Sequence, residues 1–473
     1  MLCIHAGCRR ALCALVGLFI AGALLAQWPT ASALTPSAVP EPAFDPSNHA
    51  AGAPAGVDAL RGALQPPALR DLITEVLDRN PEIARMRHRA AVAALVAPQV
   101  RALPDPVAAL SLFALPPETR AGPQRLRASI AQRVPWFGTL ALRERAARRA
   151  AAAARAMVDE TRLDQLTAAC TIAYELIFLD AYARVVDAER STLARYENAA
   201  LARYAAGTGL QQGIVRIQAA ITRADTRRLE IDERRAALTA DLNRLRDRPA
   251  DTPAPALDAD PRPAPRFDVD ALRRVAHGHR PAIAAADHRI AAAGVRIALA
   301  EKAFRPAVTF GLAYTAVDRR GDAAARLNPP DDDGDDILAL TGSLALPVRR
   351  GRLAAGLESA RAARRIAEVE KRIVLAEIER AIGDLATRMP LLHRHATLLD
   401  TVLRKQAREA LRSAETAYST GKLNAVDLLD AEVVLFEVQI ASARTRADLA
   451  IAWVALERAV GQPLVALTEG DLP

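Results

Sequence analysis

Cysteine is scarce in this 473-residue chain: there are four in total, and three of them fall within the first 33 residues. That segment, 1–33, has the form of a secretory signal, with two arginines, an apolar stretch over 11–26 and a small-residue cleavage site at Ala31–Ala33. We expect cleavage near Ala33, because the apolar stretch is shorter than the roughly 20 residues of a membrane span; a retained anchor is the alternative. The mature chain then keeps Cys170 alone, which excludes an intramolecular disulfide and predicts an inert, buried thiol.

Aromatic residues and long hydrophobic runs are also scarce. Aromatic residues make up 4% of the chain, and no charge-free apolar run of about 18 residues follows the signal, so we predict no membrane-spanning helix in the mature protein. The net charge of +8 is mild and interleaved with acids, which argues against a nucleic-acid partner. Phosphate-binding loops, nucleophile elbows and HExxH motifs are absent too, so we expect no enzyme and no cofactor. Alanine, arginine and leucine dominate instead, a composition typical of long helices and coiled coils.

Part of the sequence occurs twice, about 200 residues apart, a period far longer than that of a solenoid repeat. The segment Arg79–Ala84 (RNPEIA) recurs as His279–Ala284 (HRPAIA), and Tyr204–Gly207 (YAAG) returns as Tyr418–Gly421 (YSTG). We therefore predict a duplicated half-molecule. The predicted order is a signal peptide (1–33), an extended or mobile Ala/Pro-rich arm (34–68), a first repeat (69–247), a proline-rich linker (248–267), a second repeat (268–464) and a C-terminal tail (465–473).

Each half is expected to contain a very long helix. In the first half it runs from about Thr139 to Ala205, on the order of 100 Å at 1.5 Å per residue, a length that no compact globular core accommodates. Apolar positions three and four apart form the seam of a coiled coil in both long helices, so both need partners along their length. The two seams are Leu163, Leu166, Cys170, Ala173 and Ile177, and Ile366, Val369, Ile373 and Ala376.

Four segments of about ten residues alternate between apolar residues and small or polar ones. This is the length that a tilted strand needs to cross a bilayer, and the alternation fits a transmembrane barrel with a polar interior. A soluble sandwich with one buried face alternates in the same way and is the alternative. Four strands cannot close a barrel with a lumen, so several chains would have to pool their strands. The segments are Val107–Leu115, which alternates less cleanly, Arg125–Val134, Ala307–Ala316 and Leu338–Leu346.

Several motifs between Leu69 and Leu464 resemble those of the TolC-type outer-membrane efflux proteins, or outer membrane factors. They are Asn80–Ile83 (NPEI) with a weaker copy at 280–283, the turn Gln132–Gly138 (QRVPWFG), Ala417–Gly421 (AYSTG) and Val426–Glu432 (VDLLDAE). The resemblance implies a mainly α-helical protein with a small membrane β-barrel portion. Three identical chains would each give four strands to a twelve-stranded barrel in outer-membrane lipid, continued by a tunnel of long helical hairpins across the periplasm.

The same resemblance implies a passive exit duct that docks onto a periplasmic adaptor protein and an RND-type or ABC-type inner-membrane transporter. The Gln132–Gly138 turn is similar to that of the heavy-metal efflux branch, so metal cations as well as small toxic molecules are candidate substrates. Two other functions stay open. They are a soluble periplasmic coiled-coil adaptor or scaffold, and a type I protein-secretion duct.

The resemblance also implies a gate where the helices turn at their periplasmic end. A tight turn between antiparallel helices favours glycine, and Gly207 and Gly421 stand at the two turns. Asp427 and Asp430 are three residues apart and so share one helix face. In a symmetric trimer they would form an acidic ring that attracts cations, and the resemblance places this face at the periplasmic aperture. From the residues alone, Asp427 as a helix cap and Asp430 as a surface acid is the alternative.

Two further positions at these turns compare with the family. Tyr418 matches its gate-region tyrosine. The arginine expected two residues after the turn glycine is absent, since Leu423 stands there and Lys422 is the nearby basic residue. The first turn carries Gly213 where the second carries the acid, so we expect the first tip to contact the adaptor instead.

Other polar clusters predict no metal site. The aspartate-rich loop 331–336 lacks the spaced ligands of an EF-hand and is expected to be a solvated external loop. The pairs His277 and His279, and His393 and His395, have no further cysteine or histidine nearby, so we expect surface histidines rather than metal ligands.

Overall fold

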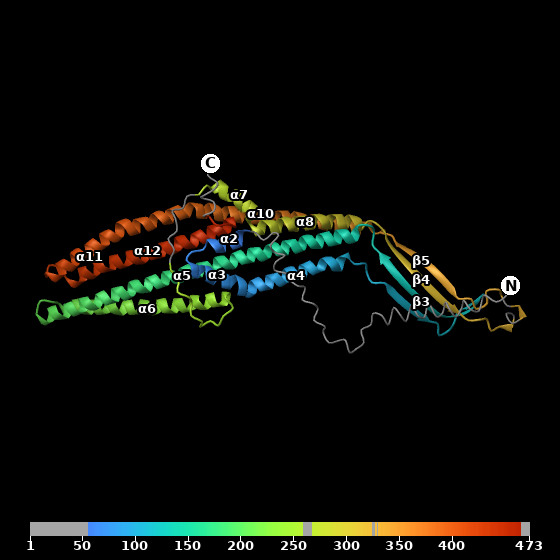
Figure 1. Cartoon of the computed structure of the whole chain (residues 1–473), viewed down its shortest axis with the longest axis horizontal. Coiled ribbons are helices and arrows are strands. Elements are labelled where there is room, and N and C mark those ends of the chain that lie inside the picture. Colours follow the sequence, from blue (N-terminus) through green and yellow to red (C-terminus); the bar gives the residue numbers. More distant parts are fainter. Residues whose placement is uncertain (1–54, 259–266, 324–326, 329, 465–473) are drawn as a thin grey trace. The chain divides into compact units, whose positions relative to one another are not determined.

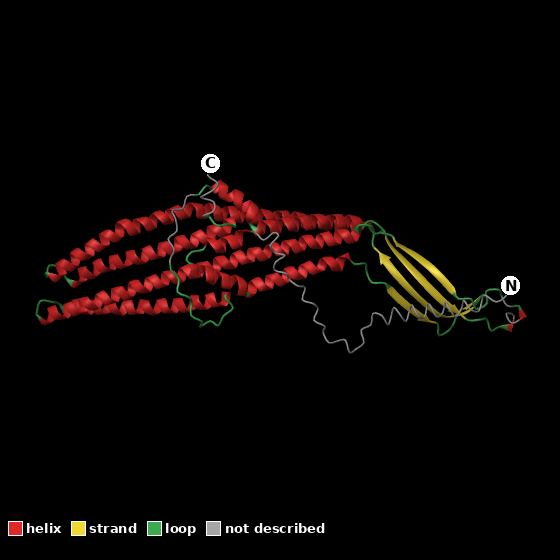
Figure 2. Ribbon diagram, viewed as in Figure 1, coloured by secondary structure: helices red, strands yellow, loops and turns green. Residues whose placement is uncertain are grey.

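The computed structural model of the protein describes residues 55–258, 267–323, 327–328 and 330–464. The predicted signal peptide, most of the predicted arm, the middle of the linker and the tail lie outside the described residues. Within them the chain is mostly helical and has one antiparallel sheet, and Figure 2 shows the strands beyond one end of the helices.

The same order of elements occurs in both halves, as Figure 1 shows: paired shorter helices, strands, a very long helix, a turn and a returning helix. The long helix predicted from Thr139 to Ala205 is present with those ends. The first half contains α2 (Ala55–Ala63), α3 (Pro67–Arg79), α4 (Pro81–Arg101), α5 (Thr139–Ala205) and α6 (Gln211–Leu245). The second contains α7 (Val269–His279), α8 (Pro281–Lys302), α10 (Arg350–Leu398), the π-helical turn η3 (Leu399–Leu403), α11 (Arg404–Ser419) and α12 (Ala425–Val460).

The end of the predicted arm is helical rather than extended, because α2 occupies Ala55–Ala63. Val57, Leu60 and Leu64 are buried and belong to the same apolar cluster as residues of α3 and α5. Their spacing of three and four residues makes one apolar helix face. Our expectation of an irregular arm was therefore wrong for this stretch, where a short amphipathic pattern is hidden among alanine, glycine and proline.

Each half has a proline break that divides its first helical segment in two. In the first half Asn80 caps α4: its Oδ1 accepts hydrogen bonds from the backbone N–H groups of Glu82 (3.0 Å) and Ile83 (3.1 Å). Pro81 follows at the first helical position, where its missing N–H costs nothing. The motif that repeats between the halves is thus a helix stop followed by a helix start.

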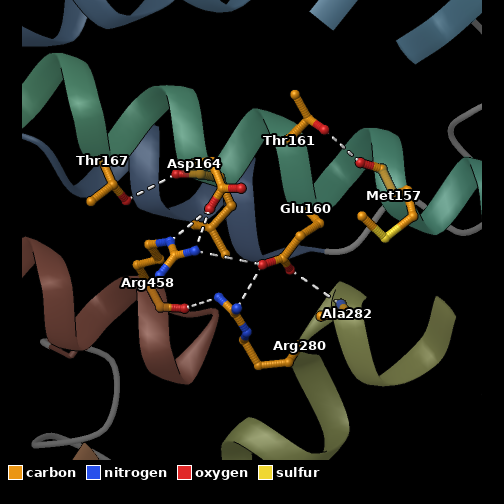
Figure 3. Close-up of polar contacts among 9 residues, drawn as sticks. Met157, Glu160, Thr161, Asp164, Thr167, Arg280, Ala282 and Arg458 are labelled. Carbon is orange, nitrogen blue, oxygen red and sulfur yellow. Dashed lines mark hydrogen bonds and ion pairs between the residues drawn. The ribbon is translucent and has the colours of Figure 1, made fainter. Parts of the chain in front are cut away.

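In the second half, the start of α8 is capped by a side chain from the first half. Arg280 replaces the capping asparagine, and Glu160 of α5 accepts the backbone N–H of Ala282 at 3.1 Å (Figure 3). The other oxygen of Glu160 pairs with the buried Arg280 guanidinium at 2.6 Å. Arg280 also donates to the carbonyl of Arg458 near the end of α12. A carboxylate on α5 therefore caps α8 and ties the two halves together.

The seam predicted on α5 forms the centre of the largest apolar cluster. Leu163, Leu166, Cys170 and Ala173 are buried against α3 and α6. By length and composition alone, α5 is the one described helix that could cross a membrane. Burial of this seam among neighbouring helices accounts for its apolar stretch, and Cys170 is buried as predicted.

Among the described residues of the protomer, nothing fully covers the seam predicted on α10. Ile366, Val369 and Ile373 are 59%, 41% and 53% exposed. The buried face of this helix lies instead on Ala367, Ile378, Ile382 and Met389. The heptad pattern of α10 therefore finds no partner among the described residues of the same protomer.

The sheet is antiparallel, with strand order β1-β3-β4-β5, and the short β2 pairs beside it with β3. The strands are β1 (Val107–Leu112), β2 (Glu118–Thr119), β3 (Gly122–Val134), β4 (Ala307–Val317) and β5 (Ile337–Ala345). The central pair, β3 and β4, joins one strand from each repeat. Within the described residues β1 and β5 each keep one unpaired edge.

The register places most of the large apolar side chains of the four long strands on one face, with Val107, Val317 and Ile337 on the other. Leu110 opposes Ala128, Ile130 opposes Leu312, and Leu312 opposes Leu340 in turn. These apolar side chains are exposed in the protomer, and Leu340 reaches 89%. The alternation predicted from the sequence therefore gives a sheet with one apolar face that nothing described in the chain covers.

Candidate functional site at the helical tips

The two helical hairpins, α5–α6 and α11–α12, turn in the same way. Gly207 and Gly421 have φ of +76° and +77°, a left-handed conformation that favours glycine. The N–H of Gly207 donates to the Tyr204 carbonyl (2.9 Å), and that of Gly421 to the Tyr418 carbonyl (3.0 Å). The predicted tight turns are thus two copies of one structure.

The N-terminus of α12 is capped by a residue that we had not singled out. The Oδ1 of Asn424 accepts the backbone N–H groups of Val426 (2.8 Å) and Asp427 (3.0 Å). The alternative in which Asp427 itself is the cap is therefore wrong. Asp427 lies in the first turn, where the helix dipole stabilises a negative charge, and both Asp427 and Asp430 are exposed.

Tyr418 connects the two tips instead of standing free at one of them. It is buried in an apolar cluster that contains Leu193 of α5, Ile217 of α6 and Leu428 of α12. Arg203 of the first hairpin donates to the Tyr418 carbonyl at 2.5 Å, and its guanidinium lies 4.8 Å from the centre of the tyrosine ring. This contact combines a charged hydrogen bond with a cation–π interaction.

Arg203 provides the arginine that the second turn lacks in its own sequence. Lys422 is exposed, and its backbone N–H closes the turn by donating to the Ala417 carbonyl at 2.9 Å. Among the described residues it makes no salt bridge. Comparison of the two repeats could have identified Arg203, because Ala417 occupies the equivalent place in the second copy.

Close packing between the hairpins explains the glycine at position 213 of the first tip. A Cβ at Gly213 would lie 3.1 Å from the Cβ of Ala425 at the start of α12. A side chain as large as aspartate at this position would push the two hairpins apart. The missing acid of the first copy thus lets the tips approach each other, and a role for this tip in adaptor contact stays a prediction.

Behind the tips, three carboxyl groups lie at the junction of the hairpins. Tyr196 of α5 donates its hydroxyl to Glu415 of α11 at 2.6 Å, and Glu189 of α5 pairs with Arg227 of α6 at 2.7 Å. Glu432 of α12 is 7% exposed, and one of its carboxyl oxygens has no hydrogen-bond partner.

Burial, together with the charges of Glu189 and Glu415, raises the pKa of the Glu432 carboxyl to about 7 against the opposing effect of Arg195. The pKa of Tyr196 is also raised, first by burial and then by its hydrogen bond to Glu415. Sequence reasoning missed this group because its members come from separate helices. Near neutral pH the charge at the hairpin junction changes with the protonation of one side chain.

Comparisons with known proteins agree with this architecture. A family described as outer membrane efflux protein matches residues 272–462, nearly the whole second repeat. The pyoverdine export outer membrane protein OpmQ of Pseudomonas putida is 31% identical over 194 residues. That match covers 38% of this chain and 37% of OpmQ, so it spans little more than a third of the relative.

Solved structures extend the likeness to most of the chain. The outer membrane protein VceC of Vibrio cholerae superposes with a TM-score of 0.69 and 24% identity, covering 84% of this chain and 96% of VceC. The open state of the MtrE outer membrane channel of Neisseria gonorrhoeae gives a TM-score of 0.68 at 18% identity, covering 84% of this chain and 90% of MtrE. At these identities the likeness shows a common fold.

Proposed function

The chain belongs to the outer membrane efflux protein family, and on that basis we propose that it forms a passive exit duct across the outer membrane. The observation that carries this proposal is the sheet, with one exposed apolar face and two unpaired edges. In water an apolar face of this kind would be covered by protein, whereas in a bilayer lipid covers it. A closed barrel is also the way in which such a sheet avoids open edges in lipid.

Closure of the barrel requires several chains, and the exposed seam of α10 supports the same conclusion. Ile366, Val369 and Ile373 form an apolar stripe without a partner in the protomer, as expected of a surface that packs against a neighbouring copy. We propose a homotrimer with a twelve-stranded barrel, the number of chains coming from the family resemblance. The helices would then continue the barrel as a tunnel.

Fractionation tests the duct directly. Mature protein with the duct function should sediment with outer membranes and run as a heat-sensitive trimer after mild detergent extraction. A soluble periplasmic adaptor would instead appear in the osmotic-shock extract. Recovery of the mature protein as a soluble monomer would overturn the proposal.

For the tips, we propose that Asp427 and Asp430 form the acidic ring of a periplasmic gate. Both are exposed, and both lie on α12 beside the buried Leu428 and Leu429, which hold this helix against its neighbours. Three copies around an axis would place six carboxylates at one constriction. Tyr418, bound by Arg203 of the first hairpin, would hold the gate hairpin in place.

The gate proposal has a specific test in planar bilayers. Replacing both Asp427 and Asp430 by asparagine should weaken the block of conductance by di- or trivalent cations added on the tip side. Asp448→Asn, on the same helix but away from the tip, is the matched control, since its partner Arg444 lies outside the gate. Block of equal strength in the double variant and the wild type would rule out the assignment.

We propose a periplasmic adaptor and an inner-membrane transporter, of RND or ABC type, as the partners of this duct. The first hairpin tip, with Gly207 at its end, is the surface that we assign to adaptor contact. The cargo would be small toxic molecules or metal species delivered by that transporter. Crosslinking from a Leu210→Cys variant, in which the exposed side chain of this tip becomes a cysteine, should capture the adaptor.

A further inference from the structure

The polar face of the sheet carries two arginines and no carboxylate. Arg127 lies opposite Ser111 and Thr315, and Arg133 lies opposite Thr309. Both arginines are exposed, and both belong to β3, at the middle of the sheet. The other strand residues that share this face are uncharged: Val107, Ala109, Ser111, Ser129, Ala131, Ala307, Thr309, Gly311, Ala313, Thr315, Val317, Ile337, Ala339, Thr341, Ser343 and Ala345.

Three acidic residues near the sheet have partners at the end where β3 begins, whereas Asp105, two residues before β1, is exposed at the other end. Asp332 pairs with Arg120 and Asp318 pairs with Arg125, both outside the regular part of the polar face. Asp333 accepts the backbone N–H of Arg320 at 2.9 Å. In the part of the chain that the structure describes, no salt bridge neutralises the two arginines of the polar face.

We infer that the strand-built part of the duct prefers anions, with Arg127 and Arg133 as the residues that set this selectivity. The inference rests on the proposed function, in which the apolar face meets lipid and the polar face lines the lumen. Each arginine would then occur three times, giving two basic rings six residues apart, about 20 Å along the strand. Rings of arginine or lysine are what anion-conducting pores use.

The size of the preference follows from Coulomb's law in water. For three charges about one Debye length from the axis, roughly 10 Å at 0.1 M salt, screening leaves an anion-to-cation preference of about fourfold for each ring. Because the wall is built from copies of one chain, the strands of the other protomers add no compensating acid. The cargo class that fits this exit is anionic organic compounds or anionic complexes, rather than free metal cations.

The acidic tip would mask this preference in a simple conductance measurement, so the test uses channels in which Asp427 and Asp430 are both asparagine. Chloride-to-potassium permeability ratios are taken from reversal potentials across a KCl gradient. This background should favour chloride. Adding Arg127→Gln with Arg133→Gln should lower the ratio at least about fourfold, the effect of one ring.

Two matched variants separate charge from structure. Arg125→Gln combined with Asp318→Asn, which removes a neutral ion pair next to the same strand face, should leave the ratio unchanged. Arg127→Lys with Arg133→Lys should retain the chloride preference, because the charge is kept. If the two glutamine substitutions leave the permeability ratio unchanged in a variant with normal trimer content, the anion inference is overturned and the duct proposal stands. If the wild-type protein forms no conducting channels in the bilayer, both the duct proposal and the anion inference are overturned.

Discussion

Replacing Glu432 by glutamine should remove a pH-dependent loss of folding stability that arises at the junction of the two hairpins. This carboxyl is buried, one of its oxygens has no partner, and Glu189 and Glu415 face it from α5 and α11. Arg195 opposes their effect, while Arg227 is engaged by Glu189. Ionisation of Glu432 therefore adds a third negative charge to a site that has little water to solvate it.

The direction of the effect follows from the pKa of Glu432, raised from 4.5 to about 7. Because the folded protein holds this proton more tightly than the unfolded chain, stability falls as the pH rises from about 4.5 to 7. Below that window the carboxyl is protonated in both states, and above it the full deficit is present. The difference corresponds to at most about 3 kcal/mol, so Glu432→Gln should gain up to this amount above pH 7 and little near pH 4.5.

Guanidinium unfolding of the detergent-solubilised protein, followed by circular dichroism over this pH range, measures the effect. Glu437→Gln is the control, since Glu437 is exposed on the same helix and its substitution should leave the pH profile unchanged. The variant at position 432 should show a flatter profile than the wild type, with the two converging in acid. Parallel profiles at every pH would refute the reasoning, because the buried carboxyl would then carry no linked proton.

Two further substitutions test the turn and the link between the halves. Gly421→Ala should destabilise the second tip by about 1–2 kcal/mol, since its φ of +77° is costly for any residue with a Cβ. Gly278→Ala, in a helix with open space around it, should be neutral or stabilising in the same unfolding assay, and equal effects would contradict this account. Glu160→Gln should cost about 3–5 kcal/mol by leaving the buried Arg280 charge unpaired, and the double variant Glu160→Gln with Arg280→Met should recover much of this loss.

Much of the architecture could be predicted from the sequence because its signals are long and periodic. The heptad seam of α5 extends over many turns, and the alternation in β4 and β5 is nearly unbroken. The short helix α2 was missed, since three apolar residues among alanine and glycine give too little periodicity. The break at Asn80 was recognised as a motif but not as a cap, because its hydrogen bonds become visible only when α4 is built.

The candidate site was less predictable because its contacts cross between hairpins. Gly207 and Gly421 could be placed from local turn chemistry alone. Arg203 was not singled out, since its partner Tyr418 lies more than two hundred positions further along the chain and only a comparison of the two repeats marks the position. The seam on α10 stays a prediction, because its residues are exposed in the protomer and periodicity does not say whether a covering helix belongs to the same chain or to another copy.

Two differences between the copies occur where the halves touch, and they bear on the proposed gate. Arg203 stands where the second copy has Ala417, and Gly213 stands where it has Asp427. Were the halves identical, each contact between them would occur twice in every protomer, and both hairpins would be held equally. In this chain the arginine comes from the first hairpin, and the acids are on the second. In the proposed gate, loss of the contact to Tyr418 would free the acid-bearing hairpin from Arg203, so we expect opening to move this hairpin more than the first one.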